Sequence, residues 1–205
     1  MKNHTGESIR IFKNPILESL THVHPIVPLV LWTPVIAFLF YYGATVQNVT
    51  PNEFIVLFFV GFVLWTFTEY IVHRYVFHWD AKSAVGKYFV FLFHGLHHDD
   101  PQDQTRLVMP PVPAILLSGV LYFLFFLVFP AKYLQVIMAY FMTGYLCYDY
   151  IHYATHHFAM TSRVGKFLRK YHLQHHYSGE SSKYGVSSPL WDYIFKTTTG
   201  PKDHH

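Results

Sequence analysis

The sequence predicts an all-α membrane protein in which four transmembrane helices form two hairpins beneath a cytosolic helical cap. Three observations support this fold class. The 205 residues are 52% hydrophobic and only 13% charged, about half the charged share of an ordinary soluble domain. Four long apolar stretches run through the chain. Histidine, whose imidazole is a common metal ligand, is concentrated in the polar ends and segments that follow the second and fourth of these stretches.

The first two apolar stretches predict the first hairpin. Residues 25–42 contain no charged side chain and approach the ~20 residues that span a bilayer, and Pro34 predicts a kink within them. A polar turn at 43–53 follows. The second stretch starts at Phe54 and continues as far as His78. Such a helix would be ~37 Å long against a hydrocarbon core of ~30 Å, so its histidine-bearing end should project into water.

The last two apolar stretches predict the second hairpin. Residues 111–131 and 133–148 are separated by a short turn, and the latter stretch continues without interruption to His156. The polar segment 79–110 and the polar region from residue 157 onward are expected to form the cap. An odd number of spans would place the histidine clusters on opposite sides of the membrane, whereas four spans keep them together.

The distribution of basic residues predicts the orientation. Of the 15 Lys and Arg residues, all except Lys132 fall outside the two predicted turns, on the side of the histidines. Basic residues are retained on the cytosolic side of membranes, so both termini and the histidines are expected there. We divide the chain into a cytosolic N-terminal segment (1–24) and one integral-membrane domain (25–205). No basic run or recognition motif suggests nucleic acid as a partner.

Ten of the 16 histidines form four clusters with metal-ligand spacing. Residues three and four apart share a face of a helix, so each H-x-x-H-H cluster should point three imidazoles the same way. His73 and His78 are five apart, so the helix must end or loosen between them. His157 adjoins a cluster, and its role as a ligand is left open. The ten predicted ligands are His73, His78, His94, His97, His98, His152, His156, His172, His175 and His176.

Ten imidazoles are too many for one ion and suit a dinuclear site, because a structural zinc needs four ligands and usually recruits Cys. Imidazole accepts zinc, copper, iron or nickel. A site at a membrane surface faces lipids, whose C–H bonds require a redox metal and O2. We therefore hypothesise two Fe ions, with zinc as a possible occupant of purified protein. Glu69, Asp99 and Asp149 are candidates to accept hydrogen bonds from ligand imidazoles, or are simply interfacial or solvated charges.

The four clusters resemble the histidine boxes of the membrane fatty acid hydroxylase/sterol desaturase superfamily. The segment H-G-L-H-H-D-D-P-Q-D-Q-T-R-L-V-M-P-P-V-P at 94–113 resembles the central signature of fatty acid 2-hydroxylases. Y-H-L-Q-H-H at 171–176, Y-G-V-S-S at 184–188 and L-W-D-Y-I-F at 190–195 do so as well. The resemblance covers roughly residues 65–195.

This resemblance implies O2-dependent 2-hydroxylation of a fatty acyl chain, as free fatty acid or as part of a lipid, at a dinuclear centre bound by the ten histidines. Family members often carry an N-terminal cytochrome b5 domain, whereas no His-Pro-Gly-Gly haem signature occurs here. A separate electron donor is therefore expected: a cytochrome b5-like protein, a ferredoxin or a flavoprotein. The shorter form suggests a bacterial inner membrane. Arg106 is a candidate for binding the acyl head group, against an interfacial role facing lipid headgroups.

Two other functions are considered. A carotenoid or sterol oxygenase or desaturase would use similar boxes, but the P-P-V-P continuation argues against it. A membrane metal transporter would place ionisable residues near the bilayer midplane, whereas here the histidines gather at one end of the spans.

Overall fold

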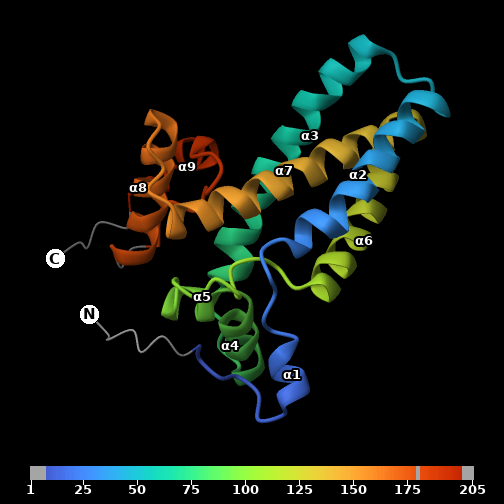
Figure 1. Cartoon of the computed structure of the whole chain (residues 1–205). Helices are drawn as coiled ribbons and strands as arrows, with labels where there is room; N and C mark the ends of the chain where they lie inside the picture. The colour runs from blue at the N-terminus through green and yellow to red at the C-terminus, as the bar shows by residue number, and fades with distance from the viewer. Residues whose placement is uncertain (1–7, 179–180, 200–205) are drawn as a thin grey trace.

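A computed structural model describes residues 8–178 and 181–199, and within those ranges the secondary structure is entirely helical (Figure 1). The predicted N-terminal segment is thus described from residue 8. His4, His204 and His205 lie outside the described residues.

The first hairpin consists of α2 (Val27–Thr45) and α3 (Pro51–Ile71), with α3 continuing as the π-helix η1 (Val72–Phe77). The Thr50 side chain caps α3 by accepting from the Glu53 N–H, and the Glu53 side chain accepts in return from the Thr50 N–H. This capping box satisfies N–H groups that have no partner within the helix. Pro34 lies inside α2 as predicted.

The second hairpin consists of α6 (Pro111–Val128) and α7 (Ala131–His157). Three helical segments are long and apolar enough to cross a membrane: α2, the continuous segment Pro51–Phe77, and α6. The fourth predicted span falls in α7, which is 27 residues long but more polar. Because α7 packs against α2, α3 and α6, it can carry polar side chains that lipid would not accept. The number of four spans stays a prediction.

Helix α7 is the centre of the helical bundle, and small residues bring its neighbours close. A Cβ atom at Gly144 would lie 2.6 Å from Trp65 Cγ, and one at Gly61 would lie 2.4 Å from Tyr140 Cβ. Trp65 also packs edge-on against Phe141, with ring centroids 5.3 Å apart. The α3–α7 contact is therefore tight along its length.

The two hairpin turns meet at the end of the molecule away from the histidines. Lys132 Nζ, at the α6–α7 turn, donates to Glu53 Oε1 at 2.6 Å beside the α2–α3 turn. Gln47 contacts Gln135 across the same junction. This arrangement confirms the predicted pair of hairpins with both turns on one side.

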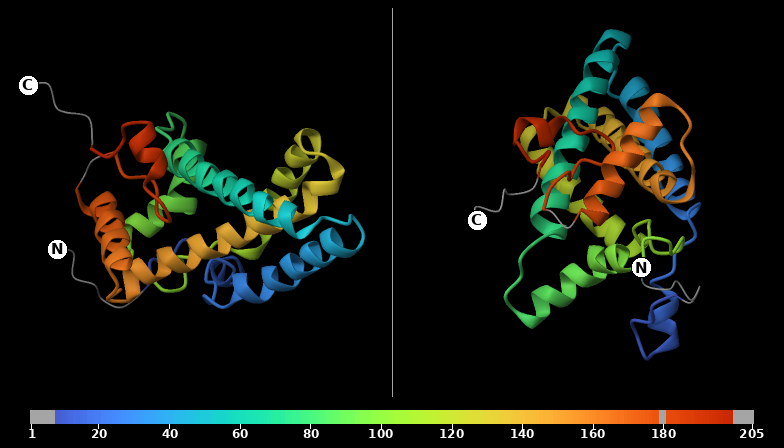
Figure 2. Two further views of the ribbon diagram at one scale, coloured as in Figure 1. Left: turned by 90° about the horizontal axis from the view of Figure 1, so that it is seen from above. Right: turned by 90° about the vertical axis from the view of Figure 1, so that its left-hand side faces the viewer.

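The cap consists of short helices at the opposite end. They are α1 (Pro15–Ser19), α4 (Ala84–Val90), the π-helix η2 (Phe91–Gly95), α5 (Leu96–Asp99), α8 (Arg163–Tyr177) and α9 (Leu190–Ile194). The left view of Figure 2 shows that α8 lies at the end of the molecule opposite the α2–α3 turn.

The predicted loosening between His73 and His78 is confirmed. The His78 N–H donates to the His73 carbonyl at 3.1 Å, an i→i+5 bond typical of a π-helix. The wider turn brings these two imidazoles to the same side of the helix. The second π-helix, η2, similarly contains His94, the first histidine of the next cluster.

Candidate metal centre

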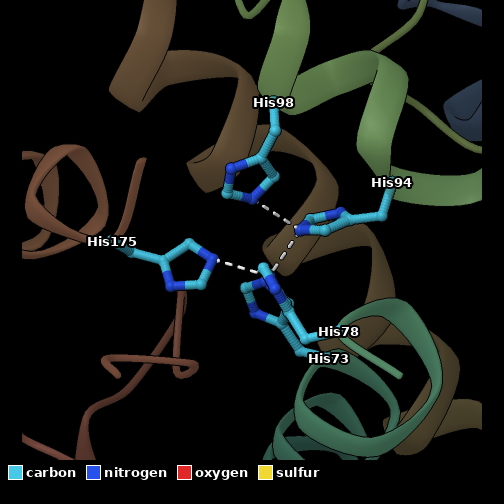
Figure 3. A group of neighbouring side chains, drawn as sticks. All are labelled: His73, His78, His94, His98 and His175. Carbon is cyan, nitrogen blue, oxygen red and sulfur yellow. Dashed lines mark hydrogen bonds between the residues drawn. The ribbon is translucent and has the colours of Figure 1, made fainter. Parts of the chain in front are cut away.

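The structure brings all ten predicted ligands together, in two groups of five. The first histidine group is His73, His78, His94, His98 and His175 (Figure 3). The second histidine group is His97, His152, His156, His172 and His176. Within each group, one potential ligand atom per residue lies within 4.8 Å of all the others. Each group therefore has the dimensions of a site for one metal ion.

Each H-x-x-H-H cluster divides between the two groups. His94 and His98 belong to the first group while His97 belongs to the second. The other cluster shows the reverse pattern, with His175 alone in the first group. Only the i,i+4 pairs point to a shared centre, because the i+3 and i+4 positions differ by about 100° around a helix. The prediction that all three imidazoles point the same way is wrong for the middle histidine.

Short distances between ring nitrogens show how the first histidine group converges. His94 Nε2 lies 3.0 Å from His73 Nε2 and 2.9 Å from His98 Nε2, and His78 Nε2 lies 2.9 Å from His175 Nε2. Two imidazoles that bind one ion at ~2.1 Å and at right angles lie ~3 Å apart. These distances therefore suit ligands of a common ion.

The second histidine group has the same geometry. His97 Nε2 lies 2.9 Å from His152 Nε2 and 3.1 Å from His176 Nε2. His156 Nε2 lies 2.8 Å from His172 Nε2. Nε2 thus faces inward in both groups, and the histidine clusters could bind metal.

Burial favours the neutral form of these imidazoles. Desolvation, with a smaller contribution from His175, lowers the pKa of His78 to about 4. Desolvation also lowers the pKa of His98 to about 3, and the pKa of His94 lies well below its usual value. Since neutral imidazole is the form that ligates metals, the groups are ready to bind at neutral pH.

Backbone carbonyls of one loop orient two of the candidate ligand imidazoles. His73 Nδ1 lies 2.5 Å from the Tyr184 carbonyl oxygen, and His175 Nδ1 lies 2.7 Å from the Ser182 carbonyl oxygen. A carbonyl can only accept, so Nδ1 carries the proton and the Nε2 lone pair is left for a metal. The loop therefore sets the tautomer of both side chains.

Two buried carboxylates hold this loop. Glu69 Oε1 accepts from the N–H groups of Val186 and Ser187, at 2.6 and 2.9 Å. Asp192 accepts from the Tyr184 N–H at 2.9 Å, through Oδ1. Close packing also restricts the loop, because a Cβ at Gly185 would lie 2.1 Å from the Ser188 carbonyl oxygen.

A largely apolar cavity of about 300 Å³ opens onto both histidine groups. His73 and His94 of the first group and His97 and His152 of the second line it. The rest of its wall comes from α3, η1, η2, α5, α6, α7, the segment 106–110 and the N-terminal segment. Apolar clefts of this size are typical of small-molecule sites. A chain-like apolar molecule in this cavity can therefore reach both histidine groups.

A family model described as fatty acid hydroxylase matches residues 58–197. The chain belongs to the fatty acid hydroxylase family. The family membership expected from the 94–113 and 171–195 motifs is therefore confirmed.

Several relatives support this membership. The chain is 38% identical to the ceramide very long chain fatty acid hydroxylase SCS7 of Saccharomyces cerevisiae, over 97% of this chain and 52% of the relative. It is 36% identical to the dihydroceramide fatty acyl 2-hydroxylase FAH1 of Arabidopsis thaliana, over 94% of this chain and 81% of that one. It is 34% identical to the fatty acid 2-hydroxylase of Homo sapiens, over 96% of this chain and 58% of the human protein. The chain thus spans about half the length of the yeast and human relatives.

The fold also matches a solved structure, described as full-length scs7p with only the hydroxylase domain visible. The TM-score is 0.83 at 36% identity, and the match covers 94% of this chain and 72% of that one. The hydroxylase fold is thus shared over almost the whole chain.

The structure places the three acidic candidates of this family member away from the imidazoles. Glu69 accepts from N–H groups of the loop and not from an imidazole. It therefore acts on His73 indirectly, through the loop that contains the Tyr184 carbonyl. Asp149 is buried in the cavity wall, and its Oδ2 atom has no hydrogen-bond partner among the described residues. Asp99 is exposed at the end of α5. The structure describes no hydrogen bond from an imidazole to any of the three.

Arg106 lines the cavity, but its guanidinium is already paired with other side chains. Its side chain is only 5% exposed. It donates to Glu18 Oε1 at 2.6 Å and lies 2.9 Å from His22 Nε2, and it also donates to the Ile9 carbonyl. The guanidinium therefore fastens the N-terminal segment to the cap, and its role at the acyl head group stays a prediction.

His157 lies outside both histidine groups and packs against Tyr153, with ring centroids 4.6 Å apart. The sequence interpretation missed the loop residues Ser182, Tyr184 and Asp192. No spacing pattern marks them in the sequence. Ser182 and Tyr184 act through their backbone carbonyls, which any residue type provides. The only signal in the sequence was the resemblance of 184–188 and 190–195 to the family motifs.

Proposed function

We propose that this protein uses O2 to hydroxylate carbon 2 of fatty acyl chains, at two iron ions held by the two histidine groups. The substrate is a free fatty acid or the acyl part of a lipid. The observation that carries the proposal is the apolar cavity whose inner wall contains histidines of both groups. The names of the yeast and plant relatives, which are ceramide and dihydroceramide acyl hydroxylases, support the same reaction.

The ten imidazoles fit a pair of irons, because all are nitrogen ligands held in the neutral form and grouped five to a centre. When bound, the irons supply the redox chemistry by which O2, two electrons and two protons convert a C–H bond to C–OH and release one water. Zinc accepts the same ligands but has no redox chemistry, so zinc-loaded protein should be inactive.

The protein's own contribution is to bind the chain, orient it and exclude water. Apolar side chains such as Leu117, Leu121 and Met142 line the cavity between α6 and α7. Helix α6 exposes Leu116, Val120 and other apolar side chains on its outer face. We infer that the acyl chain enters from the bilayer beside α6, with its polar end at the histidines.

We propose that the cap faces the cytosol and that a separate protein supplies the electrons. The concentration of basic residues around the cap favours a cytosolic position for the histidine groups. The reaction consumes two electrons, and we propose a separate donor protein, of the cytochrome b5, ferredoxin or flavoprotein type. A bacterial inner membrane stays an expectation from the sequence.

Mass spectrometry of lipids from cells with and without the protein tests the reaction. We expect 2-hydroxy acyl products from the wild type, and none from His97→Ala or His175→Ala, each of which removes one ligand from a different group. His24→Ala, at an exposed position outside both groups, should retain the product. Hydroxylated sterol or carotenoid rings, or activity that follows zinc content and ignores iron, would contradict the proposal.

A further inference from the structure

Helix α8 has two chemically different faces. Its buried face carries Leu168, His172 and His175, and thus provides ligand candidates to both histidine groups. Its outer face exposes Lys166, Lys170 and other polar side chains. One helix, ~10 Å across, therefore separates the solvent from the metal centre.

The outer face of α8 is strongly basic. Arg163, Lys166, Arg169 and Lys170 lie within two turns, and the helix contains no acidic residue. Within residues 8–178 and 181–199, no carboxylate forms an ion pair with any of the four. Arg169 Nε is buried without a hydrogen-bond partner among those residues. Lys166, Arg169 and Lys170 border a surface groove, so their charges are available to an incoming anionic surface.

Exposed apolar side chains accompany these charges. Val164 is 69% exposed, Phe167 44% and Tyr177 66%, and all three belong to α8. Aromatic residues and arginine are enriched in protein interfaces. The combination suits a protein surface better than a small anion.

The position of α8 favours a soluble partner over the membrane. Helix α8 lies at the end of the molecule opposite the α2–α3 turn (Figure 1; Figure 2, left). It therefore lies beyond the end of α7, against which it packs, and not among the helices long and apolar enough to cross the membrane.

We propose that the outer face of α8 is the docking surface for an acidic, one-electron carrier protein. This inference rests on the proposed function, since hydroxylation consumes two electrons. A carrier docked there would be separated by a single helix from His172, His175 and His176, and thus from both groups. Opposite charges across an interface mainly raise the association rate and orient the partner, as suits a donor that must bind, deliver one electron and leave.

The test is charge reversal of two exposed lysines, Lys166→Glu with Lys170→Glu, neither of which lies in the histidine groups or the acyl cavity. The matched control is Lys82→Glu with Lys87→Glu, which makes the same change in net charge on the exposed surface around α4. The probe is the soluble haem domain of a cytochrome b5, an acidic one-electron carrier. Binding of its oxidised form to the detergent-solubilised, metal-loaded protein is measured by calorimetry at low and high salt.

We expect the α8 variant to weaken binding of the haem domain about tenfold or more at low salt, and the control to bind like the wild type. High salt should weaken wild-type binding and leave the variant little changed. The KM for the reduced haem domain should rise in parallel. Equal binding by the variant and the wild type, or an equal loss in the control, would overturn the inference.

A single turnover separates this inference from the proposed function. Protein reduced anaerobically with dithionite, freed of excess reductant and then exposed to O2 needs no docked donor. We expect the α8 variant to form as much 2-hydroxy acyl product as the wild type under these conditions. A loss of product in the variant would overturn the docking role, and a wild type without product would overturn the proposed function and this inference with it.

Discussion

His98 and His176 stack with their ring centroids 4.1 Å apart, yet they belong to different histidine groups. His98 Nε2 faces His94 at 2.9 Å, and His176 Nε2 faces His172 at 3.0 Å. The two groups are thus adjacent and share a wall of imidazole rings. This adjacency supports a single dinuclear centre over two independent metal sites.

Replacing His98 by Ala should remove one candidate ligand of the first histidine group and the stacking contact with His176. We expect the bound metal to fall from about two ions per chain to about one, because a site that loses a ligand binds metal more weakly. Elemental analysis of purified protein measures this, with His24→Ala as the control. Full metal content in the His98 variant would contradict the assignment of His98 as a ligand.

Replacing Glu69 by Gln should act on the metal centre through the loop. The neutral amide oxygen would accept from the Val186 and Ser187 N–H groups more weakly than a carboxylate oxygen does, so the Tyr184 carbonyl is held less firmly against His73. We expect metal affinity to fall by about 10- to 100-fold, as for other groups that orient ligands. Competition with a chelator measures the affinity.

Glu53→Gln is the matched control for this substitution. Glu53 also accepts from a backbone N–H, but at the opposite end of α3. We expect Glu53→Gln to lower thermal stability without changing metal affinity. Equal metal affinities in the two variants would show that Glu69 has no role in positioning ligands.

Replacing Arg106 by Ala should release the N-terminal segment. Removing one partner of a buried ion pair is strongly destabilising, because the other charge is left uncompensated, and Glu18 is only 14% exposed. We expect limited proteolysis within residues 8–24 to become about tenfold faster or more. Arg10→Ala, whose side chain bonds among the described residues to carbonyls of its own segment, should change the rate little.

The position of hydroxylation tests the same residue in a second way. Because the guanidinium is already paired, we expect Arg106→Ala to keep oxidation at carbon 2. Products hydroxylated elsewhere on the chain would instead show that Arg106 binds the acyl head group.

Acid should destabilise the metal-free protein. The pKa values of His78 and His98 lie at about 4 and about 3, below the ordinary value near 6.5. Below pH 6.5 the unfolded chain binds protons that the folded side chains do not, so the free energy of unfolding falls with pH, by up to about 1.4 kcal/mol per pH unit for each group. The decline should continue until the folded side chains also take up protons.

Thermal unfolding of chelator-treated protein between pH 7 and pH 4 measures this dependence. The Tm should fall steadily over that range. A Tm that is constant from pH 7 to pH 5 would show that the two imidazoles are solvated in the metal-free state.

The sequence predicted the helices and the ten histidines because both leave local signals. Apolar runs of span length mark α2, α3 and α6, and the clustered histidines mark the candidate ligands. The five-residue spacing of His73 and His78 even predicted an irregular helix. The division of His94, His97 and His98 between two groups could not be predicted, since it depends on which partners approach each side of the helix. The ion pair of Arg106 could not be predicted for the same reason, because its partner Glu18 is 88 residues away.

Two glycines show the same limit and provide a sharp test of the α3–α7 packing. Nothing in the sequence distinguishes Gly144 from Gly119, since both lie in predicted spans. In the structure a Cβ at Gly144 would lie 2.6 Å from Trp65 Cγ, whereas one at Gly119 would meet nothing within 4 Å. Trp65 lines the cavity, so displacing it should also disturb substrate binding.

We therefore expect Gly144→Ala to destabilise the protein by about 1–3 kcal/mol, as overpacking does, and to raise the KM for the acyl substrate. Gly119→Ala should be neutral or stabilising by up to about 1 kcal/mol, because Ala is the better helix former. Unfolding in detergent and acyl-substrate kinetics measure the two effects. Equal stability and equal KM in the two variants would contradict this expectation. They would show that α3 can move away from α7 and that Trp65 is not rigidly packed in the cavity wall.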